Sequence, residues 1–401
     1  MTTIDTRESW LRLMMVFFVA SIGNVGLWSI VYVMPSIEVD FALDRSQTSL
    51  PYVLTMIGFA VGNLIFGWLL DRYGLFLILL VATVLISVGY VLATISNTIF
   101  MFSGTQFLIG LGTAVSFAPL MADISHWFKK YRGVAVAVVA SGNYFSGAIS
   151  ALILVETIES EGWRTAYLLL ASACFVIIIP LAIILNKNKA VTKNSVDEIV
   201  NLETGPTVFL NLNSMTILLC IASICCCVAM SMPQVHIVSY CVDLGFGSLL
   251  GGQMLALMLI GGVLSRLFFG FVADSLGGLK TVLIGSALQC FALFLYLPFD
   301  GLVSLFTVSF IFGLSQGGIV PSYAVIVREF MPGSVAGSKI GLIIMATIIG
   351  MAFGGFLSGE IYDLTGSYQA AFINGILWNL INFIIIGFLY YLWTVRQKNL
   401  K

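Results

Sequence analysis

The sequence predicts an all-α membrane protein in which twelve transmembrane helices form two pseudo-symmetric six-helix bundles. Three observations lead to this prediction. Hydrophobic residues make up 59% of the 401 residues and charged residues only 9%, whereas about 25% of residues are charged in soluble domains. Twelve apolar runs are long enough to cross a bilayer. A short phrase also occurs twice, 203 residues apart, which indicates that one long unit is present in two copies.

Each apolar run has about 18 to 25 residues, the length that crosses about 30 Å of hydrocarbon. Alternating patterns of short strands are absent, which excludes a transmembrane β-barrel. Residues 1–186 should form the first bundle, 187–212 a cytoplasmic polar linker, and 213–401 the second bundle. In chain order, the helices are expected at about 12–34, 48–70, 76–95, 98–125, 133–155, 165–186, 214–240, 248–273, 280–298, 301–328, 338–360 and 370–394.

The repeated phrase lies where one apolar run ends and the next begins. Its first copy runs from Gly67 to Gly74 and its second from Gly270 to Gly277. An offset of 204, one residue longer, relates Gly162-Trp163-Arg164 to Gly366-Ser367-Tyr368. Internal duplication in a membrane protein is typical of secondary transporters.

The basic residues predict the orientation of the chain. Fifteen of the eighteen Lys and Arg residues lie in segments that share one side of the membrane with both termini. Only Arg45 and Arg164 fall on the other side, and Arg266 lies inside a span. Basic loops stay in the cytoplasm, so we expect both termini there, in a plasma membrane such as the bacterial inner membrane. The net charge of −1 gives no indication of nucleic-acid binding.

The repeated Gly-x-x-x-Asp-x-x-Gly phrase and the twelve-span plan resemble the major facilitator superfamily over almost the whole chain. The resemblance implies two bundles that rock about a central site. The first copy departs from the family pattern, because Leu75 and Phe76 replace basic residues. The signature and gating residues implied by the resemblance are Gly67, Asp71, Arg72, Gly74, Gly270, Asp274 and Gly277.

Two structural roles are expected of this signature. Asp71 and Asp274 lie at helix ends, where a carboxylate can accept hydrogen bonds from the N-terminus of a neighbouring helix. Gly67 and Gly270 should allow close helix packing. Because the two copies are at matched positions, we favour these roles over that of two unrelated surface acids.

A narrower resemblance is to the monocarboxylate porters and the oxalate/formate antiporters. It rests on Trp127–Gly133, on Arg266, on Gly313–Pro321 and on Asp363–Tyr368. In that branch the arginine of the eighth helix binds a substrate carboxylate. The chain departs from the oxalate exchangers because Met345-Ala346-Thr347-Ile348 contains no lysine. It also departs from many animal porters, because Gly262 replaces an acid and the first helix has no interior lysine.

Arg266 is the strongest single candidate for substrate binding. A charge inside a span costs about 2.5–3.5 kcal/mol on insertion scales, and no acid near the spans is an obvious partner. A guanidinium can bind a carboxylate through two parallel hydrogen bonds, which indicates a substrate-anion site. The alternative is a structural arginine bonded to backbone carbonyls of a neighbouring helix. Asn63, 203 residues earlier, is expected to face the same cavity or to bond to another helix.

Other polar residues complete the candidate set. Each is expected either to contact substrate or to serve in packing and interhelix hydrogen bonds. They are Tyr32, Asn143, Gln316 and Tyr323. His236 is a candidate carrier of a coupling proton, since histidine changes charge near neutral pH; the alternative is a structural or gate residue.

No metal-ligand spacing, nucleotide loop or catalytic triad is present, so we predict no cofactor and no enzyme. The sequence predicts a secondary active transporter, most simply a monomer, that carries a small organic anion. A monocarboxylate is favoured because no second interior cation is evident, and proton symport is favoured because a proton reduces the net charge of the loaded carrier. The alternatives are an anion exchanger, proton-driven drug efflux and a receptor that binds without transport. The absence of an acid within the first helix opposes efflux, and the absence of a signalling domain opposes a receptor.

Overall fold

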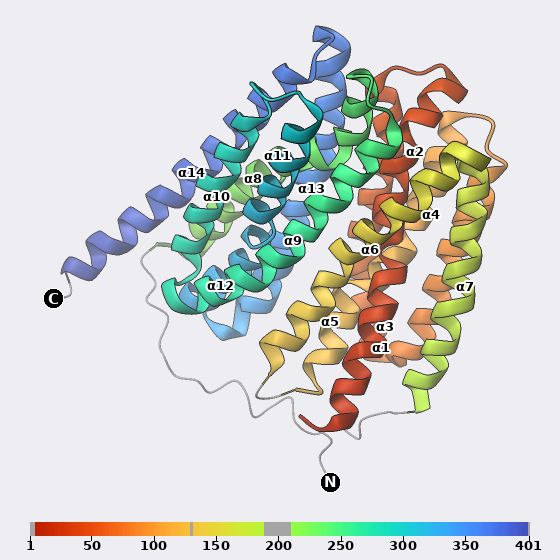
Figure 1. The fold of residues 1–401 in the computed structure, drawn as a ribbon. Coiled ribbons are helices and arrows are strands. Elements are labelled where there is room, and N and C mark those ends of the chain that lie inside the picture. The colour runs from red at the N-terminus through yellow and green to blue at the C-terminus, as the bar shows by residue number, and fades with distance from the viewer. Residues whose placement is uncertain (1–4, 129–130, 188–209, 400–401) are drawn as a thin grey trace. The chain divides into compact units, whose positions relative to one another are not determined.

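The structure is a computed structural model that describes residues 5–128, 131–187 and 210–399. The expected linker at 187–212 lies almost wholly outside these residues. The described parts contain fourteen α-helices and one 3₁₀ helix, which supply twelve candidate membrane spans. The predicted helical class and number of spans are therefore confirmed (Figure 1).

The helices of the first half are α1 (Arg7–Gly23), α2 (Val25–Phe41), α3 (Arg45–Thr94), α4 (Ile99–Thr113), the 3₁₀ helix η1 (Ala114–Ser116), α5 (Ala118–Ser125), α6 (Arg132–Glu161) and α7 (Trp163–Lys187). Those of the second half are α8 (Leu212–Asp243), α9 (Ser248–Leu276), α10 (Gly278–Leu295), α11 (Leu302–Gln316), α12 (Ile319–Phe330), α13 (Gly333–Thr365) and α14 (Tyr368–Asn399).

Several spans consist of more than one helix. The first is α1 and α2, which meet at Asn24, and the fourth is α4, η1 and α5. The tenth is α11 and α12. Conversely, α3 holds two spans separated at Gly74, whose φ of 75° is in the left-handed region that favours glycine. Gly277, at the matching position, has a φ of 81°.

Helix contacts repeat with the same offset as the sequence. A Cβ atom at Gly58 would lie 2.2 Å from the carbonyl oxygen of Phe107. A Cβ atom at Gly261 would lie 2.9 Å from the carbonyl oxygen of Phe310. Both residues of the second pair are 203 positions after those of the first, so the duplicated sequence folds into duplicated packing. Glycine is needed because each pair of helices meets backbone to backbone.

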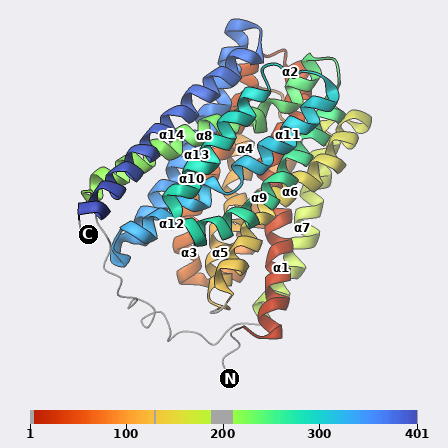
Figure 2. The same ribbon diagram turned by 60° about the vertical axis from the view of Figure 1, so that its left-hand side comes forward.

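The chain divides into two compact units. Unit 1 comprises Met1–Val191, Val235–Ile260 and Gly355–Leu364, and unit 2 comprises Thr192–Gln234, Gly261–Gly354 and Thr365–Lys401. Unit 1 thus contains α1–α7 with the end of α8, the start of α9 and the end of α13. In unit 2, an apolar core joins α8, α10, α12, α13 and α14, and α10 runs beside α14 (Figures 1 and 2).

We expect Gly58→Ala to lower the thermal unfolding midpoint of the detergent-solubilised protein. Its methyl group would overlap a backbone carbonyl, and overpacking of this kind costs about 1–3 kcal/mol. Gly104→Ala is the matched control, because a Cβ atom at Gly104 meets no heavy atom within 4 Å. Equal midpoints for the two variants would show that the contact of Gly58 with Phe107 is not close.

Candidate functional site

Two spans are interrupted at matched positions. In unit 1, η1 separates α4 from α5 at Ala114–Ser116. In unit 2, α11 ends at Gln316 and α12 begins at Ile319, which leaves the break at Gly317-Gly318. Adding 203 to Ala114 gives Gly317. Matched interruptions in the two halves of a transporter indicate its binding site. In the sequence, the adjacent glycines Gly317-Gly318 mark the break in unit 2.

Each break has a carbonyl oxygen bound by a side chain from another helix. In unit 1, Asn24 Nδ2 donates to the carbonyl oxygen of Ser116 at 2.9 Å. In unit 2, Arg266 Nε donates to the carbonyl oxygen of Gly317 at 3.4 Å. Helix breaks release such carbonyls, and a buried carbonyl without a donor is costly. These side chains therefore support the two interruptions.

Arg266 lies half-buried where α9 meets the break in unit 2. The two helices approach closely, because a Cβ atom on Gly317 would lie 2.2 Å from the carbonyl oxygen of Gly262. The bond to Gly317 is of the kind expected for a structural arginine. A guanidinium carries five N–H donors, however, so support of one carbonyl and binding of a carboxylate are compatible roles.

Two buried polar groups lie at the same helix contact. Gln316 accepts a hydrogen bond from Gln234 Nε2 at 2.9 Å through its Oε1. Its Nε2 is buried and has no hydrogen-bond partner among the described residues, and neither does Oγ of the buried Ser265. A buried donor without an acceptor costs about 1–3 kcal/mol. These groups are suited to binding a ligand that carries acceptor oxygens.

Asn63 occupies the corresponding place in unit 1. Its neighbour Gly62 packs against the break, since a Cβ atom there would lie 2.6 Å from Cβ of Ala114. Asn63 Nδ2 donates to the carbonyl oxygen of Phe59 in its own helix at 2.8 Å. Its Oδ1 is buried and has no partner among the described residues. The structure thus places Asn63 and Arg266 at equivalent breaks, each in its own unit.

The remaining polar candidates bond to other helices. In unit 1, Tyr32 donates to the carbonyl oxygen of Gly147 at 2.6 Å. Oδ1 of Asn143 accepts from Trp28 Nε1 at 2.8 Å, so both candidates lie at the contact of α2 with α6. In unit 2, Tyr323 donates to Asn382 Oδ1 at 2.7 Å. These contacts fit the interhelix alternative for all three residues.

His236 is also engaged. It is 1% exposed, and its Nε2 lies 2.7 Å from the carbonyl oxygen of Gly355 on α13. Because a carbonyl oxygen can only accept, the ring N–H donates a hydrogen bond to it. The contact fits the structural alternative for this residue.

The expected close packing at Gly67 and Gly270 is not found, because a Cβ atom at either position meets no heavy atom within 4 Å among the described residues. The side chain of Asp71 lies outside the described part. The guanidinium of Arg72 is exposed and lies over the Trp68 ring, 5.5 Å from its centroid. Gly74 contributes its positive φ to the loop.

A carboxylate does bind the helix that follows the second signature, but it is not Asp274. Glu329, near the end of α12, accepts from the backbone N–H of Gly278 at 3.0 and 3.1 Å. Asp274 is exposed, and its carboxylate accepts no hydrogen bond from the N-terminus of α10 among the described residues. The expected interaction of a carboxylate with a helix N-terminus is therefore present in unit 2 with a different acid.

A matched pair of such contacts, not anticipated from the sequence, lies at one end of unit 1. Asp363 on α13 accepts from the backbone N–H groups of Arg45 and Ser46 at the start of α3, at 3.0 and 2.8 Å. Glu159 on α6 accepts from the Ser248 hydroxyl and the Leu249 N–H at the start of α9. Arg45 and Ser248 are 203 positions apart, and Glu159 and Asp363 are 204 apart. Both acids bind the positive end of a helix dipole.

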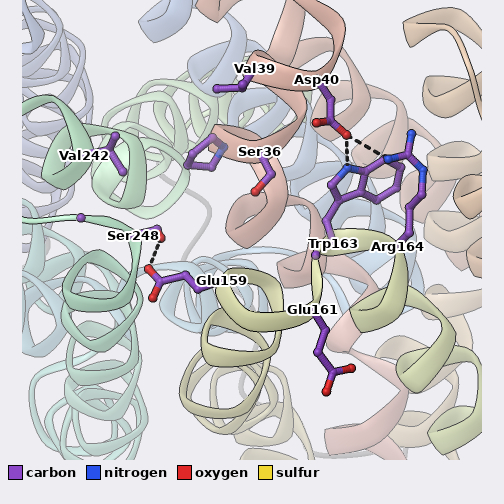
Figure 3. A pocket seen from close by; sticks show the side chains of 12 residues that line it. Ser36, Val39, Asp40, Glu159, Glu161, Trp163, Arg164, Val242 and Ser248 are labelled. Carbon is purple, nitrogen blue, oxygen red and sulfur yellow. Dashed lines mark hydrogen bonds and ion pairs between the residues drawn. The ribbon is translucent and has the colours of Figure 1, made fainter.

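A recess of about 720 Å³ opens beside the second of these contacts (Figure 3). Its charged groups are largely engaged with their neighbours. Asp40 accepts from Arg164 at 2.9 Å and from Trp163 Nε1 at 2.7 Å, and Glu159 binds Ser248. This pairing makes the recess a poor candidate for binding a substrate anion.

Comparison with known proteins gives a consistent result. The family model described as Major Facilitator Superfamily matches residues 13–338 and 217–400. The chain is 23% identical to the sialic acid transporter NanX of Escherichia coli, over 90% of this chain and 89% of the relative. It is 25% identical to monocarboxylate transporter 13 of Bos taurus, over 72% and 68%. It is 27% identical to monocarboxylate transporter 11 of Homo sapiens, over 79% and 69%.

Solved structures share the fold. The nucleoside transporter NupG superposes with a TM-score of 0.72 at 13% identity, over 94% of this chain and 99% of that one. The peptide transporter POT in complex with alafosfalin gives 0.74 at 13% identity, over 95% and 94%.

The contact at the start of α10 gives a test of the corrected signature assignment. Glu329→Ala should speed amide hydrogen exchange around Gly278 and destabilise this helix end by about 0.5–2 kcal/mol, the usual effect of removing a cap. Asp274→Ala is the control and should leave exchange unchanged. Faster exchange in the Asp274 variant alone would restore the original assignment.

Proposed function

Because the chain belongs to the Major Facilitator Superfamily, it is a multi-pass membrane transporter for a small molecule, and we propose that this molecule is a small organic anion carried by alternating access. In this proposal Arg266 binds the substrate carboxylate. The names of the sialic acid and monocarboxylate transporters related to the chain support an acidic substrate.

The observation that carries the proposal is the position of Arg266 at an interrupted span. Its guanidinium touches the released carbonyl of Gly317, and the buried donors of Gln316 and Ser265 belong to the same contact between helices. A guanidinium, an amide N–H and a hydroxyl all donate hydrogen bonds. Together they suit a ligand whose carboxylate and neighbouring oxygen atoms are acceptors.

A monocarboxylate is preferred over a dicarboxylate. The stretch around Thr347 on α13 supplies no cation, and the Thr347 hydroxyl donates to the carbonyl of Ile344 in its own helix. A second carboxylate would therefore have no matching positive charge from this stretch. Burying such an ion costs several kcal/mol.

Proton symport is the preferred coupling. A monoanion that moves with one proton carries no net charge across the membrane potential, which acts on each unbalanced charge. The distribution of basic residues supports an orientation with both termini in the cytoplasm, and the proposed location is a plasma membrane. We propose a monomer, because a single chain already contains both of the duplicated halves.

Arg266→Lys should weaken carboxylate binding by roughly 10- to 100-fold, because it loses the paired hydrogen bonds of the planar fork, each worth about 1.5–3 kcal/mol with a charged partner. Arg266→Ala should abolish uptake of labelled monocarboxylate into proteoliposomes. Arg328→Lys, at an exposed arginine near the end of α12, is the control and should transport normally. Wild-type uptake by the alanine variant would refute the anion site.

Lactate-sized monoanions should compete with labelled monocarboxylate at least about tenfold better than oxalate-sized dianions, since each 1.4 kcal/mol is worth a factor of ten. Thr347→Lys should narrow this gap by supplying a second positive charge. Thr347→Met is the control: it adds a long side chain without a charge, and it should leave the gap between monoanions and dianions unchanged. If both classes of anion inhibit equally in the wild type, another group must supply the second charge.

A further inference from the structure

A single buried arginine gathers carboxylates from three helices at one end of unit 1. The side chain of Arg45, at the start of α3, is 8% exposed. Its Nη2 lies 2.6 Å from Oδ1 of Asp243 at the end of α8, and its Nε lies 3.1 Å from Oε2 of Glu38 near the end of α2. Asp363 on α13 binds the backbone N–H of the same residue. We call these four residues the Arg45 cluster.

An aromatic ring and two further titratable groups lie near the Arg45 cluster. The guanidinium lies 5.2 Å from the centroid of the Tyr362 ring on α13. His236 on α8 is within electrostatic reach of Arg45 and Asp363, and the carboxylate of Asp44 acts on Glu38 from the start of α3. With Asp44 included, four acids share one permanent cation.

Glu38 shares the single positive charge of Arg45 with a second carboxylate, that of Asp243. Asp243, in direct contact with the guanidinium, already balances the single charge of Arg45. Glu38 Oε2 is buried and has no hydrogen-bond partner among the described residues, although it lies within ion-pair distance of Arg45. Two ionised carboxylates that share one cation repel each other, and a proton on one of them removes this repulsion.

We propose that Glu38 takes up a proton when the ends of α8 and α13 close onto α2 and α3, and releases it when these ends separate. Closure brings Asp243 and Asp363 near Glu38 and removes water from one oxygen of its carboxylate, Oε2. Separation returns the carboxylate to water and moves the other acids away. A proton bound more tightly by the closed arrangement must, by linkage, stabilise that arrangement. Acidic conditions should therefore favour the closed Arg45 cluster.

His236 is less suited to this role. Its Nε2 already bonds to the carbonyl of Gly355, and a second positive charge there would be repelled by Arg45. The idea that protonation of Glu38 is coupled to transport rests on the proposed function. The idea that the contact between these helix ends depends on pH does not rest on it.

Ser49→Cys provides a reporter for closure. Ser49 is fully buried one turn after Arg45, and its hydroxyl would lie 2.9 Å from a Cβ atom on Gly359 of α13. Separation of α3 from α13 should expose the introduced thiol to N-ethylmaleimide. Mass spectrometry would follow this site separately from the seven natural cysteines. Each rate would be divided by that of unfolded protein at the same pH, which removes the intrinsic titration of the thiol.

In the otherwise wild-type background, normalised labelling should slow on acidification by up to about tenfold per pH unit, the limit for one linked proton. Adding Glu38→Gln, which mimics the protonated acid, should give slow labelling that no longer depends on pH. Glu38→Asp keeps a carboxylate and should retain the dependence. Asp40→Asn is the matched control: Asp40 lies at the same end of unit 1 but pairs with Arg164, so the dependence should persist.

The inference is overturned if Glu38→Gln retains the wild-type pH dependence, or if the wild type shows none. Size-exclusion chromatography of each variant would establish that it is folded. The labelling needs no substrate, so a failure to transport monocarboxylates would count against the proposed function without changing this result.

Discussion

A helix can be interrupted inside a membrane only where neighbouring protein binds the backbone groups that the break releases. This constraint organises the candidate site. In unit 1 the carbonyl of Ser116 is bound by the amide of Asn24, and in unit 2 the carbonyl of Gly317 is bound by Arg266. The duplicated scaffold thus has two supported breaks. The donor is neutral in one copy and cationic in the other, and in the proposed function this cation attracts the substrate anion to unit 2.

The sequence could predict the fold because its signals are local. Twelve runs of apolar residues and a repeat of 203 positions do not depend on tertiary contacts, and the structure has the expected number of spans. The breaks at Ala114 and Gly317 were missed because apolar residues surround them, so hydropathy continues through each break. Their cause is tertiary: Gly317 leaves room for the carbonyl of Gly262.

Functional residues were harder to assign because their roles also depend on tertiary contacts. The prediction that a carboxylate binds a helix N-terminus near the second signature was chemically sound, but Glu329 occupies that place and Asp274 does not. The two acids are far apart in sequence, and only folding decides which of them reaches Gly278. The polar side chains of Tyr32, Asn143 and Tyr323 are of the kinds that line a binding site. Each, however, makes a hydrogen bond to another helix, which composition and periodicity cannot distinguish from ligand contact.

The central claim is that Arg266 binds a carboxylate at the interrupted tenth span. Equilibrium binding tests it most directly, by thermal unfolding of the purified protein over a concentration series of small monocarboxylates. A ligand that binds the native state stabilises it by RT ln(1 + [L]/Kd), about 2.7 kcal/mol at 100 times Kd. We expect at least one monocarboxylate to raise the unfolding midpoint of the wild type and to have little effect on Arg266→Lys. Equal stabilisation of both proteins would contradict the claim.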